Sequence, residues 1–178
     1  YGKHISIGFL GRMNKNKGIE DLLSIFNKLD TKNLTLKVGG YAESSYLEYL
    51  QSISSEEIKE RISYLGYVSN RKTFFDSVDL FVFPSFSEGL GLVLLEAMSF
   101  SKICITRDIL PMNSYLTEEN GYLFKNNEEF LSILNQAIDD LRNDNNKIKS
   151  KLFNIEQMVK KSSAKKIFPL IEKVYRNE

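Results

Sequence analysis

The sequence has few of the side chains on which many enzymes build metal centres and covalent intermediates. Its 178 residues include one cysteine, Cys104, and one histidine, His4. A single cysteine excludes a disulfide within the chain and a cysteine cluster for a metal ion. With one histidine, the chain alone cannot supply a zinc site or a histidine-based nucleophile triad. Cys104 stands between Ile103 and Ile105, and we expect it to be buried and unreactive.

The chain also lacks an excess of one charge and a long apolar run. It carries 24 basic and 23 acidic residues, so its net charge is +1. Nothing in that balance indicates a nucleic-acid partner. No apolar run approaches the roughly 18 residues that a membrane-spanning helix needs. No signal peptide is recognisable at the beginning, and we expect a cytoplasmic location.

What the chain does contain is a regular alternation of short apolar runs and amphipathic segments. The apolar runs predict strands over residues 5–10, 34–38, 62–65, 80–83, 103–106 and 121–124. The amphipathic segments predict helices over residues 19–29, 45–53, 56–59, 70–77, 91–100, 127–141, 145–160 and 163–176. Asn70 is a suitable cap for the fourth of these helices. Strands that alternate with helices predict an α/β fold with a parallel sheet.

A basic loop follows the first predicted strand. In an open α/β sheet, ligands bind beyond the carboxyl ends of the strands, so the loops that begin there are candidate sites. This loop contains Arg12 and Lys17 between Gly11 and Gly18. An arginine fork and a mobile lysine charge can grip a diphosphate, and the helix that begins near Gly18 adds backbone N–H groups. The alternative is a solvated basic surface loop.

The loop after the fourth predicted strand places a carboxylate beside two glycines. Glu88 lies between a strand end and a helix start, and Gly89 and Gly91 follow it. The glycines permit positive φ and close backbone approach, so the N–H groups of about residues 90–93 can point at an anion or a sugar hydroxyl. The carboxylate of Glu88 is suited to accept hydrogen bonds from sugar hydroxyls.

Glu96 is the only charged residue between Gly89 and Phe100. The residues around it are apolar on nearly every face of the predicted helix, and we expect this helix to be largely buried. A buried carboxylate needs hydrogen-bond donors, and the two adjacent hydroxyls of a ribose would supply them. The alternative is an exposed position on the outer face of an amphipathic helix.

Several common nucleotide and metal motifs are absent from the sequence. It contains neither the Gly-x4-Gly-Lys-Ser/Thr spacing of a P-loop nor a Gly-x-Gly-x-x-Gly turn after the first predicted strand. No Asp-x-Asp motif is present, because the two residues of Asp139-Asp140 are adjacent. We therefore expect no metal site and no bound cofactor.

Several motifs together resemble the group 1 glycosyltransferases. Glu88-x7-Glu96, within Pro84-Ser-Phe-Ser-Glu-Gly-Leu-Gly-Leu-Val-Leu-Leu-Glu-Ala-Met98, resembles the signature of this retaining, family 4-like group. Gly8-Phe-Leu-Gly-Arg12 with Lys17-Gly18 resembles its phosphate-binding loop. The resemblance implies one Rossmann-like lobe of a GT-B fold. Residues 1–178 would form a single C-terminal nucleotide-sugar-binding domain, and the N-terminal acceptor domain would be absent from the chain.

The resemblance also implies roles for individual residues. Arg12 and Lys17 would bind the donor diphosphate and Glu88 would contact the transferred sugar, and these three residues would act in catalysis. Glu96 would hold the ribose hydroxyls, and the base would lie near Val68. The expected donor-binding residues are Gly11, Arg12, Lys17, Val68, Glu88, Gly89, Leu90, Gly91, Leu92 and Glu96.

The sequence departs from the family pattern after Met98. Where the family usually has Gly and then Pro before the next strand, this chain has Ser101 and Ile103. Beyond that strand, Arg107-Asp-Ile-Leu-Pro-Met-Asn113 replaces a Gly-rich turn with an acidic residue. The loop after Thr106 therefore gives no indication of which sugar is transferred.

The activity implied by the resemblance is transfer of a hexose from a nucleotide-diphosphate sugar to a glycan or lipid-linked acceptor, with retention and without a metal. The Lys-, Asn- and Ile-rich composition indicates an AT-rich bacterial genome, and bacteria use this family in lipopolysaccharide and surface-polysaccharide biosynthesis. Such a role is compatible with peripheral attachment at the inner face of the cytoplasmic membrane. Two alternatives are a non-catalytic nucleotide-sugar-binding module and another GT-B enzyme, such as a nucleotide-sugar epimerase.

Overall fold

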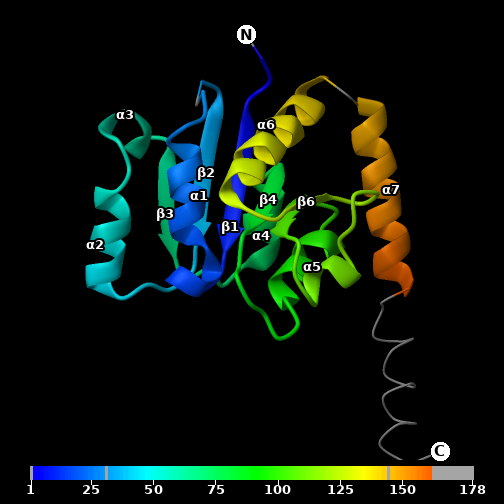
Figure 1. Ribbon diagram of the computed structural model, residues 1–178, viewed down its shortest axis with the longest axis horizontal. Coiled ribbons are helices and arrows are strands. Elements are labelled where there is room, and N and C mark those ends of the chain that lie inside the picture. Colours follow the sequence, from blue (N-terminus) through cyan, green and yellow to red (C-terminus); the bar gives the residue numbers. More distant parts are fainter. Residues whose placement is uncertain (1, 31, 144, 162–178) are drawn as a thin grey trace, which may run out of the picture.

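The computed structural model shows a parallel β-sheet flanked by helices (Figure 1). It describes residues 2–30, 32–143 and 145–161, so the helix predicted over residues 163–176 lies outside the described residues. The strands are β1 (Ile5–Leu10), β2 (Leu34–Gly39), β3 (Ile62–Gly66), β4 (Leu80–Phe83), β5 (Ile103–Arg107) and β6 (Tyr122–Phe124). The helices are η1 (Lys15–Lys17), α1 (Ile19–Phe26), α2 (Ser44–Ser52), α3 (Glu56–Lys59), α4 (Arg71–Asp76), α5 (Leu92–Ser99), η2 (Met112–Ser114), α6 (Asn127–Asn143) and α7 (Asn145–Lys161). The predicted α/β fold is confirmed.

The six strands lie in the order β3-β2-β1-β4-β5-β6, and each neighbouring pair is parallel. β1 and β4 occupy the centre, and every residue of both strands is buried. Ile7 of β1 is in register with Leu36 of β2 on one side and with Leu80 of β4 on the other. Because helices cover both faces of such a sheet, its central strands are continuous apolar runs rather than alternating ones.

The chain path reverses direction at the middle of the sheet. From β1 it moves outward to β2 and β3, and it then returns through α4 to β4, on the other side of β1. Since crossovers between parallel strands are right-handed, this reversal puts α1 and α4 on opposite faces. Figure 1 shows α1 and α6 in front of the sheet and α4 behind it. The reversal opens a crevice at the carboxyl ends of β1 and β4, where open α/β sheets bind ligands.

Two local predictions are confirmed. The Asn70 side chain caps α4, because its Oδ1 accepts a hydrogen bond of 3.0 Å from the backbone N–H of Thr73. Cys104 is fully buried in β5, and burial raises the pKa of its thiol well above the ordinary value. The thiol is therefore protonated at neutral pH, as expected for a small core residue.

The prediction that the helix around Glu96 is largely buried is wrong. Only Leu94, Ala97 and Met98 of α5 are buried, and Leu92 is well exposed. Leu92 and Val93, at the start of α5, line the cleft at the carboxyl ends of the strands, and Val93 also packs against the core. Sequence periodicity cannot distinguish these two situations, since both produce an apolar helix surface.

No helix within residues 2–30, 32–143 and 145–161 is both long enough and apolar enough to span a membrane.

Candidate functional site

A cleft of about 760 Å³ lies at the carboxyl ends of β1 and β4. Its walls come from the loops after β1, β2, β3 and β4 and from the beginning of α5. Nine of the ten residues predicted to bind a donor line it: Gly11, Arg12, Lys17, Val68, Glu88, Gly89, Leu90, Gly91 and Leu92. The fold therefore brings four separate loops of the sequence to one surface, at the position where the strand order reverses.

Lys17 and Glu88 meet inside this cleft. Lys17 Nζ lies 2.6 Å from Glu88 Oε1, and both side chains are largely buried, with exposed fractions of 23% and 10%. The ammonium group also lies 5.8 Å from the centre of the Phe83 ring. The cation predicted for a diphosphate and the carboxylate predicted for a sugar are thus paired with each other.

Local packing explains why these two side chains meet. Gly18 has a left-handed backbone with φ of 69°, and a Cβ there would lie 2.3 Å from the carbonyl oxygen of Pro84. Only glycine permits this approach of the loop after β1 to the loop after β4. The backbone N–H of Phe86 donates to the Asn16 carbonyl at 2.8 Å. The Asn16 side chain then accepts from Ser87 Oγ and donates to the Ser87 carbonyl, at 2.9 and 3.2 Å.

The cleft carries an excess of positive charge. Arg12, Lys17 and Arg71 line it together with one carboxylate, that of Glu88. Arg12 is exposed, and its guanidinium forms no hydrogen bond or ion pair with the part of the chain that the structure describes. A free guanidinium and a lysine that can exchange its partner are suited to bind a diphosphate.

The beginning of α5 adds backbone donors to the same wall. Gly91 precedes the helix with φ of 61°, as the sequence predicted, and a Cβ there would lie 2.8 Å from the Tyr115 hydroxyl. Gly89 does not have positive φ, and the space around its Cα is open. The first N–H groups of a helix have no intrahelical partner, and Leu92 and Val93 both line the cleft. They can therefore bind an anion there.

Tyr115 supports this wall from behind. Its hydroxyl donates a hydrogen bond to the carbonyl of Leu90. Burial, and secondarily the negative charge of Glu88, raise the pKa of Tyr115 above its ordinary value. The phenol therefore remains protonated at neutral pH and keeps donating to the loop that carries Glu88.

Glu96 is the one predicted donor-binding residue that does not line the cleft. Its side chain is 42% exposed, and its Oε2 lies 3.6 Å from Nε of Arg71, which does line the cleft. That oxygen is itself buried and accepts no hydrogen bond from the described residues. Glu96 thus retains acceptor capacity next to the cleft, but from a half-exposed helix and with an arginine as neighbour.

Asn14, Tyr41 and Arg71 are among the residues of the cleft wall that sequence reasoning did not identify. Tyr41 directly follows the Gly39-Gly40 pair at the end of β2, and Arg71 begins α4 shortly after β3. The rule that ligands bind at the carboxyl ends of strands could have identified both. Asn14 has a structural role as well, because its Oδ1 accepts a hydrogen bond of 3.1 Å from the Lys17 N–H.

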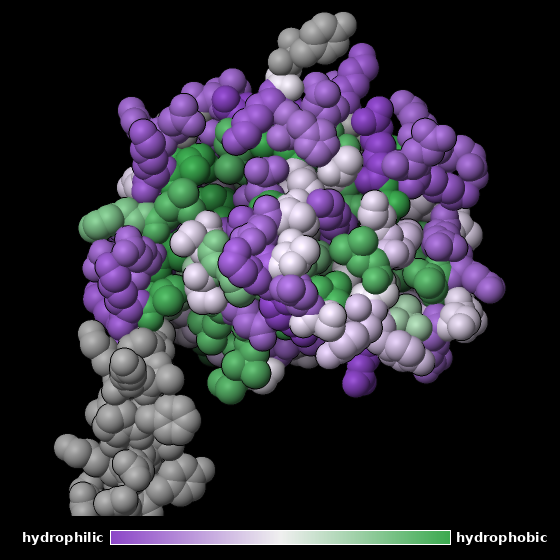
Figure 2. Space-filling view, turned by 180° about the vertical axis from the view of Figure 1, so that it is seen from behind, coloured by the Kyte–Doolittle hydropathy of each residue, from purple (hydrophilic) through white to green (hydrophobic). Residues whose placement is uncertain are grey.

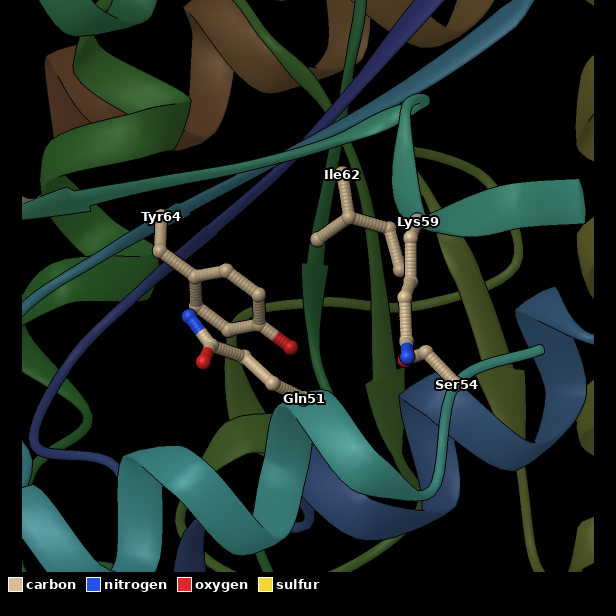
Figure 3. Close-up of a pocket in the computed structure, with 5 residues that line it drawn as sticks. All are labelled: Gln51, Ser54, Lys59, Ile62 and Tyr64. Carbon is tan, nitrogen blue, oxygen red and sulfur yellow. The ribbon is translucent and has the colours of Figure 1, made fainter. Parts of the chain in front are cut away.

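A smaller pocket of about 280 Å³ lies beside the edge strand β3. Figure 3 shows Tyr64 and Lys59 beside this space, above the end of α2. Ile62 begins β3, so the pocket reaches the amino end of the strand, away from the crevice. Lys59 is paired with Glu56, and burial raises the pKa of the Tyr64 hydroxyl. The polar groups of this smaller pocket are therefore neutral or already paired, whereas Arg12 of the larger cleft has no side-chain partner among the described residues.

Potential metal ligands are dispersed in the described ranges. No three His, Cys, Asp or Glu side chains in residues 2–30, 32–143 and 145–161 lie close enough together to hold a metal ion.

Proteins of similar sequence include enzymes of polysaccharide synthesis. A glycogen synthase of Clostridium kluyveri is 28% identical over 145 residues, which are 75% of this chain and 30% of that protein. A capsular polysaccharide biosynthesis glycosyltransferase, CapM of Staphylococcus aureus, is 27% identical over 148 residues, or 78% of this chain and 37% of that protein. The chain thus spans about a third of the length of these relatives.

Solved structures share the fold. HepE of Anabaena, in complex with UDP and glucose, superposes with a TM-score of 0.84 at 19% identity, over 99% of this chain and 49% of HepE. The C-terminal domain of LpcC, a group 1 family glycosyl transferase of Francisella tularensis, superposes with a TM-score of 0.72 at 22% identity, over 89% of this chain and 86% of that domain. The sheet and its helices therefore match a Rossmann-like lobe of GT-B glycosyltransferases.

The family assignment rests on most of the chain. Residues 1–152 match the family described as glycosyl transferases, group 1. This range contains all six strands, and both loops that carry Lys17 and Glu88. The chain belongs to the group 1 glycosyl transferases.

Proposed function

We propose that this chain is the donor-binding domain of a retaining hexosyltransferase that uses a nucleotide-diphosphate sugar. The observation that carries the proposal is the meeting of Lys17 and Glu88 in the cleft where the strand order reverses. A cation and a carboxylate at this position match the two halves of a sugar diphosphate. Arg12, which has no partner among the described residues, supplies a second cation on the phosphate side.

The chemistry of the transfer requires stabilisation of a departing phosphate. When the bond between the sugar and the diphosphate breaks, negative charge develops on the diphosphate oxygens. Arg12, Lys17 and the N–H groups at the start of α5 would stabilise that charge, and Glu88 would hold the sugar beside them. With two cations and a helix N-terminus in place, we propose that transfer proceeds without a metal ion or another cofactor.

Ribose and base would occupy the other end of the cleft. Val68 and Arg71 line the cleft, and Glu96 lies beside Arg71 with a half-exposed side chain that can present its carboxylate to a ligand. We propose that Glu96 accepts hydrogen bonds from the ribose hydroxyls and that the base lies near Val68. HepE was crystallised with UDP, which makes a uridine nucleotide the first candidate to test.

The cleft is open on one side, and apolar side chains surround the opening. Tyr41, Tyr67, Leu90 and Leu92 line the cleft and are well exposed. Figure 2 shows apolar side chains at the lower border of the molecule, where the carboxyl ends of the strands lie. We propose that an N-terminal lobe covers this opening and carries the acceptor, because exposed apolar surface with a polar surround marks an interface. The isolated domain would then bind nucleotides without turnover.

The acceptor and the pathway rest on the relatives. CapM acts in capsular polysaccharide biosynthesis, and WaaB is a galactosyltransferase of the lipopolysaccharide outer core. We propose a glycan or lipid-linked acceptor in bacterial lipopolysaccharide or surface-polysaccharide biosynthesis. The protein would work in the cytoplasm, at the inner face of the membrane where such acceptors are held.

A thermal-shift experiment with UDP, GDP and ADP tests the proposed site. A ligand at 100 times its Kd stabilises the folded protein by about 2.7 kcal/mol. For a domain of this size, that corresponds to a rise in Tm of about 5–10 °C. We expect one of the three diphosphates to give such a shift and its nucleoside monophosphate to give a smaller one. No shift with any of the three would refute the proposed site.

A further inference from the structure

Arg107 is a buried cation at the end of β5, where the sequence departs from the family pattern. It is 7% exposed. Its Nη2 donates to Asp21 Oδ2 at 2.9 Å, and its Nη1 donates to the Lys125 carbonyl at 3.2 Å. The guanidinium carbon lies 4.9 Å from the centre of the Phe124 ring. Arg107 is thus fixed by charge, by a backbone carbonyl and by an aromatic ring at the same time.

A second aromatic contact connects Arg107 to the loop that carries Glu88. The guanidinium carbon lies 4.1 Å from the centre of the Phe86 ring, two residues before Glu88. Phe86 is 49% exposed and therefore contributes little to the core. Its backbone N–H is bonded to the carbonyl of Asn16, next to Lys17. The side chain of Phe86 is consequently held by Arg107, and its backbone is held by the loop that carries Lys17.

Arg107 itself does not line the cleft, and its buried guanidinium is engaged by Asp21 and Lys125. It links α1, through Asp21, to the loop between β4 and α5, through Phe86. α1 follows directly on the loop that carries Lys17, and the loop between β4 and α5 carries Glu88. We propose that Arg107 is a positioning residue, which fixes residues 85–91 so that Glu88 and the donors at the start of α5 are held for the sugar diphosphate. This inference rests on the proposed function of the cleft.

The geometry requires an arginine rather than a positive charge alone. A guanidinium is planar, so it can stack on the rings of Phe86 and Phe124 while its edge donates to Asp21 and Lys125. A lysine at the same place can keep one ion pair but cannot stack. Arg107→Lys therefore separates the stacking contact from the charge.

The loop is tested first in the absence of ligand, by hydrogen exchange of the backbone amides. We compare Arg107→Lys and Phe86→Leu with Ile58→Val, a control that removes one methylene group from a buried residue of α3, outside the cleft. We expect amides of residues 85–91 to exchange at least tenfold faster in the first two variants and at the wild-type rate in Ile58→Val. Wild-type exchange of this loop in Phe86→Leu would overturn the proposal, even if Arg107→Lys failed to fold.

The effect on the cleft is tested by titration with UDP-glucose and GDP-mannose on this chain and its variants. Arg107→Lys and Phe86→Leu should each raise the Kd about tenfold, and the double variant should bind no more weakly than either, because both act through one contact. Additive effects, about 100-fold in the double variant, would overturn the proposal. If the wild type binds neither sugar nucleotide, the proposed function fails, while hydrogen exchange still decides whether Arg107 positions the loop.

Discussion

Two ion pairs join the segment after β1 to the loop after β4 and to the end of β5. Lys17 meets Glu88 at 2.6 Å, and Asp21 meets Arg107 at 2.9 Å. The side chains of both pairs are mostly buried, with exposed fractions of 23% and 10% for the first and 21% and 9% for the second. They differ in their remaining partners. Arg107 also has a backbone carbonyl and two aromatic rings, whereas among the described residues the Lys17 ammonium has only a distant ring besides its carboxylate.

This difference in further contacts determines in which pair a ligand can replace one partner. A buried pair with several further contacts is costly to break, because the remaining charge has no solvent and no replacement. The Lys17–Glu88 pair borders an open cleft, so water or a ligand can replace either partner. The Asp21–Arg107 pair is therefore a fixed structural contact, whereas the Lys17–Glu88 pair can be exchanged for contacts with a ligand. The following predictions test this distinction.

The largest effect is expected from Glu88→Gln in the two-lobed enzyme that we propose. Glutamine has nearly the same size, but it cannot present a negative charge to the sugar or to Lys17. We expect kcat to fall by about 100- to 1,000-fold, as for loss of one electrostatic contact to a transition state. Steady-state kinetics with the sugar nucleotide identified by binding would measure it.

The matched control is Glu56→Gln, which neutralises the carboxylate of an exposed ion pair with Lys59. It should leave kcat unchanged. Near wild-type turnover in Glu88→Gln would contradict the proposed catalytic role of Glu88.

The second prediction compares the stability costs of removing the two cations. Arg107→Met should lower the free energy of unfolding by about 3 kcal/mol, because it removes the cation from the mostly buried carboxylate of Asp21, which keeps a neutral hydrogen bond of 3.1 Å from Asn127 Nδ2. Lys17→Met should lower it by less than about 1 kcal/mol, because Glu88 can be hydrated from the cleft. Urea denaturation of the two variants measures both values. Equal losses would show that the two pairs do not differ as proposed.

The smallest effect concerns a third pair, Arg71 and Glu96, which is the most open of the three. If Glu96 accepts hydrogen bonds from the ribose, the wild type should bind UDP about tenfold more tightly than 2′-deoxy-UDP, the value of one hydrogen bond to a charged group. In Glu96→Ala this preference should disappear. Calorimetric titration measures all four affinities, and a preference retained in the variant would assign the ribose to another residue.

The fold was largely predictable because its signals are local. The apolar runs of β1 and β4 are strands because both faces of each are covered, and the structure agrees with the predicted ranges. The helix α5 was predicted at the correct place, but the prediction that it is largely buried was wrong. An apolar helix surface beside a cleft has the same composition as one in the core, so the half-exposed position of Glu96 could not be inferred.

The contacts within the site were less predictable because they depend on strand order. Lys17 and Glu88 are separated by 71 positions, and their pairing requires β1 and β4 to be neighbours. The sequence indicated both residues but assigned them to different parts of a ligand. Arg71 was overlooked, since its ion pair with Glu96 arises only when α4 and α5 are placed in the fold. Arg107 was noticed only as a departure from a family pattern.

The close approach of Gly18 to Pro84 has a consequence for protein engineering. A Cβ at Gly18 would lie 2.3 Å from the Pro84 carbonyl oxygen, so the two loops fit together only in matched conformations. A chimera that takes residues 84–91 from a relative, in order to change donor preference, would have to take residues 11–18 from the same relative. Exchange of either segment alone would combine two loops whose conformations do not match. We therefore expect that the two loops must be exchanged together.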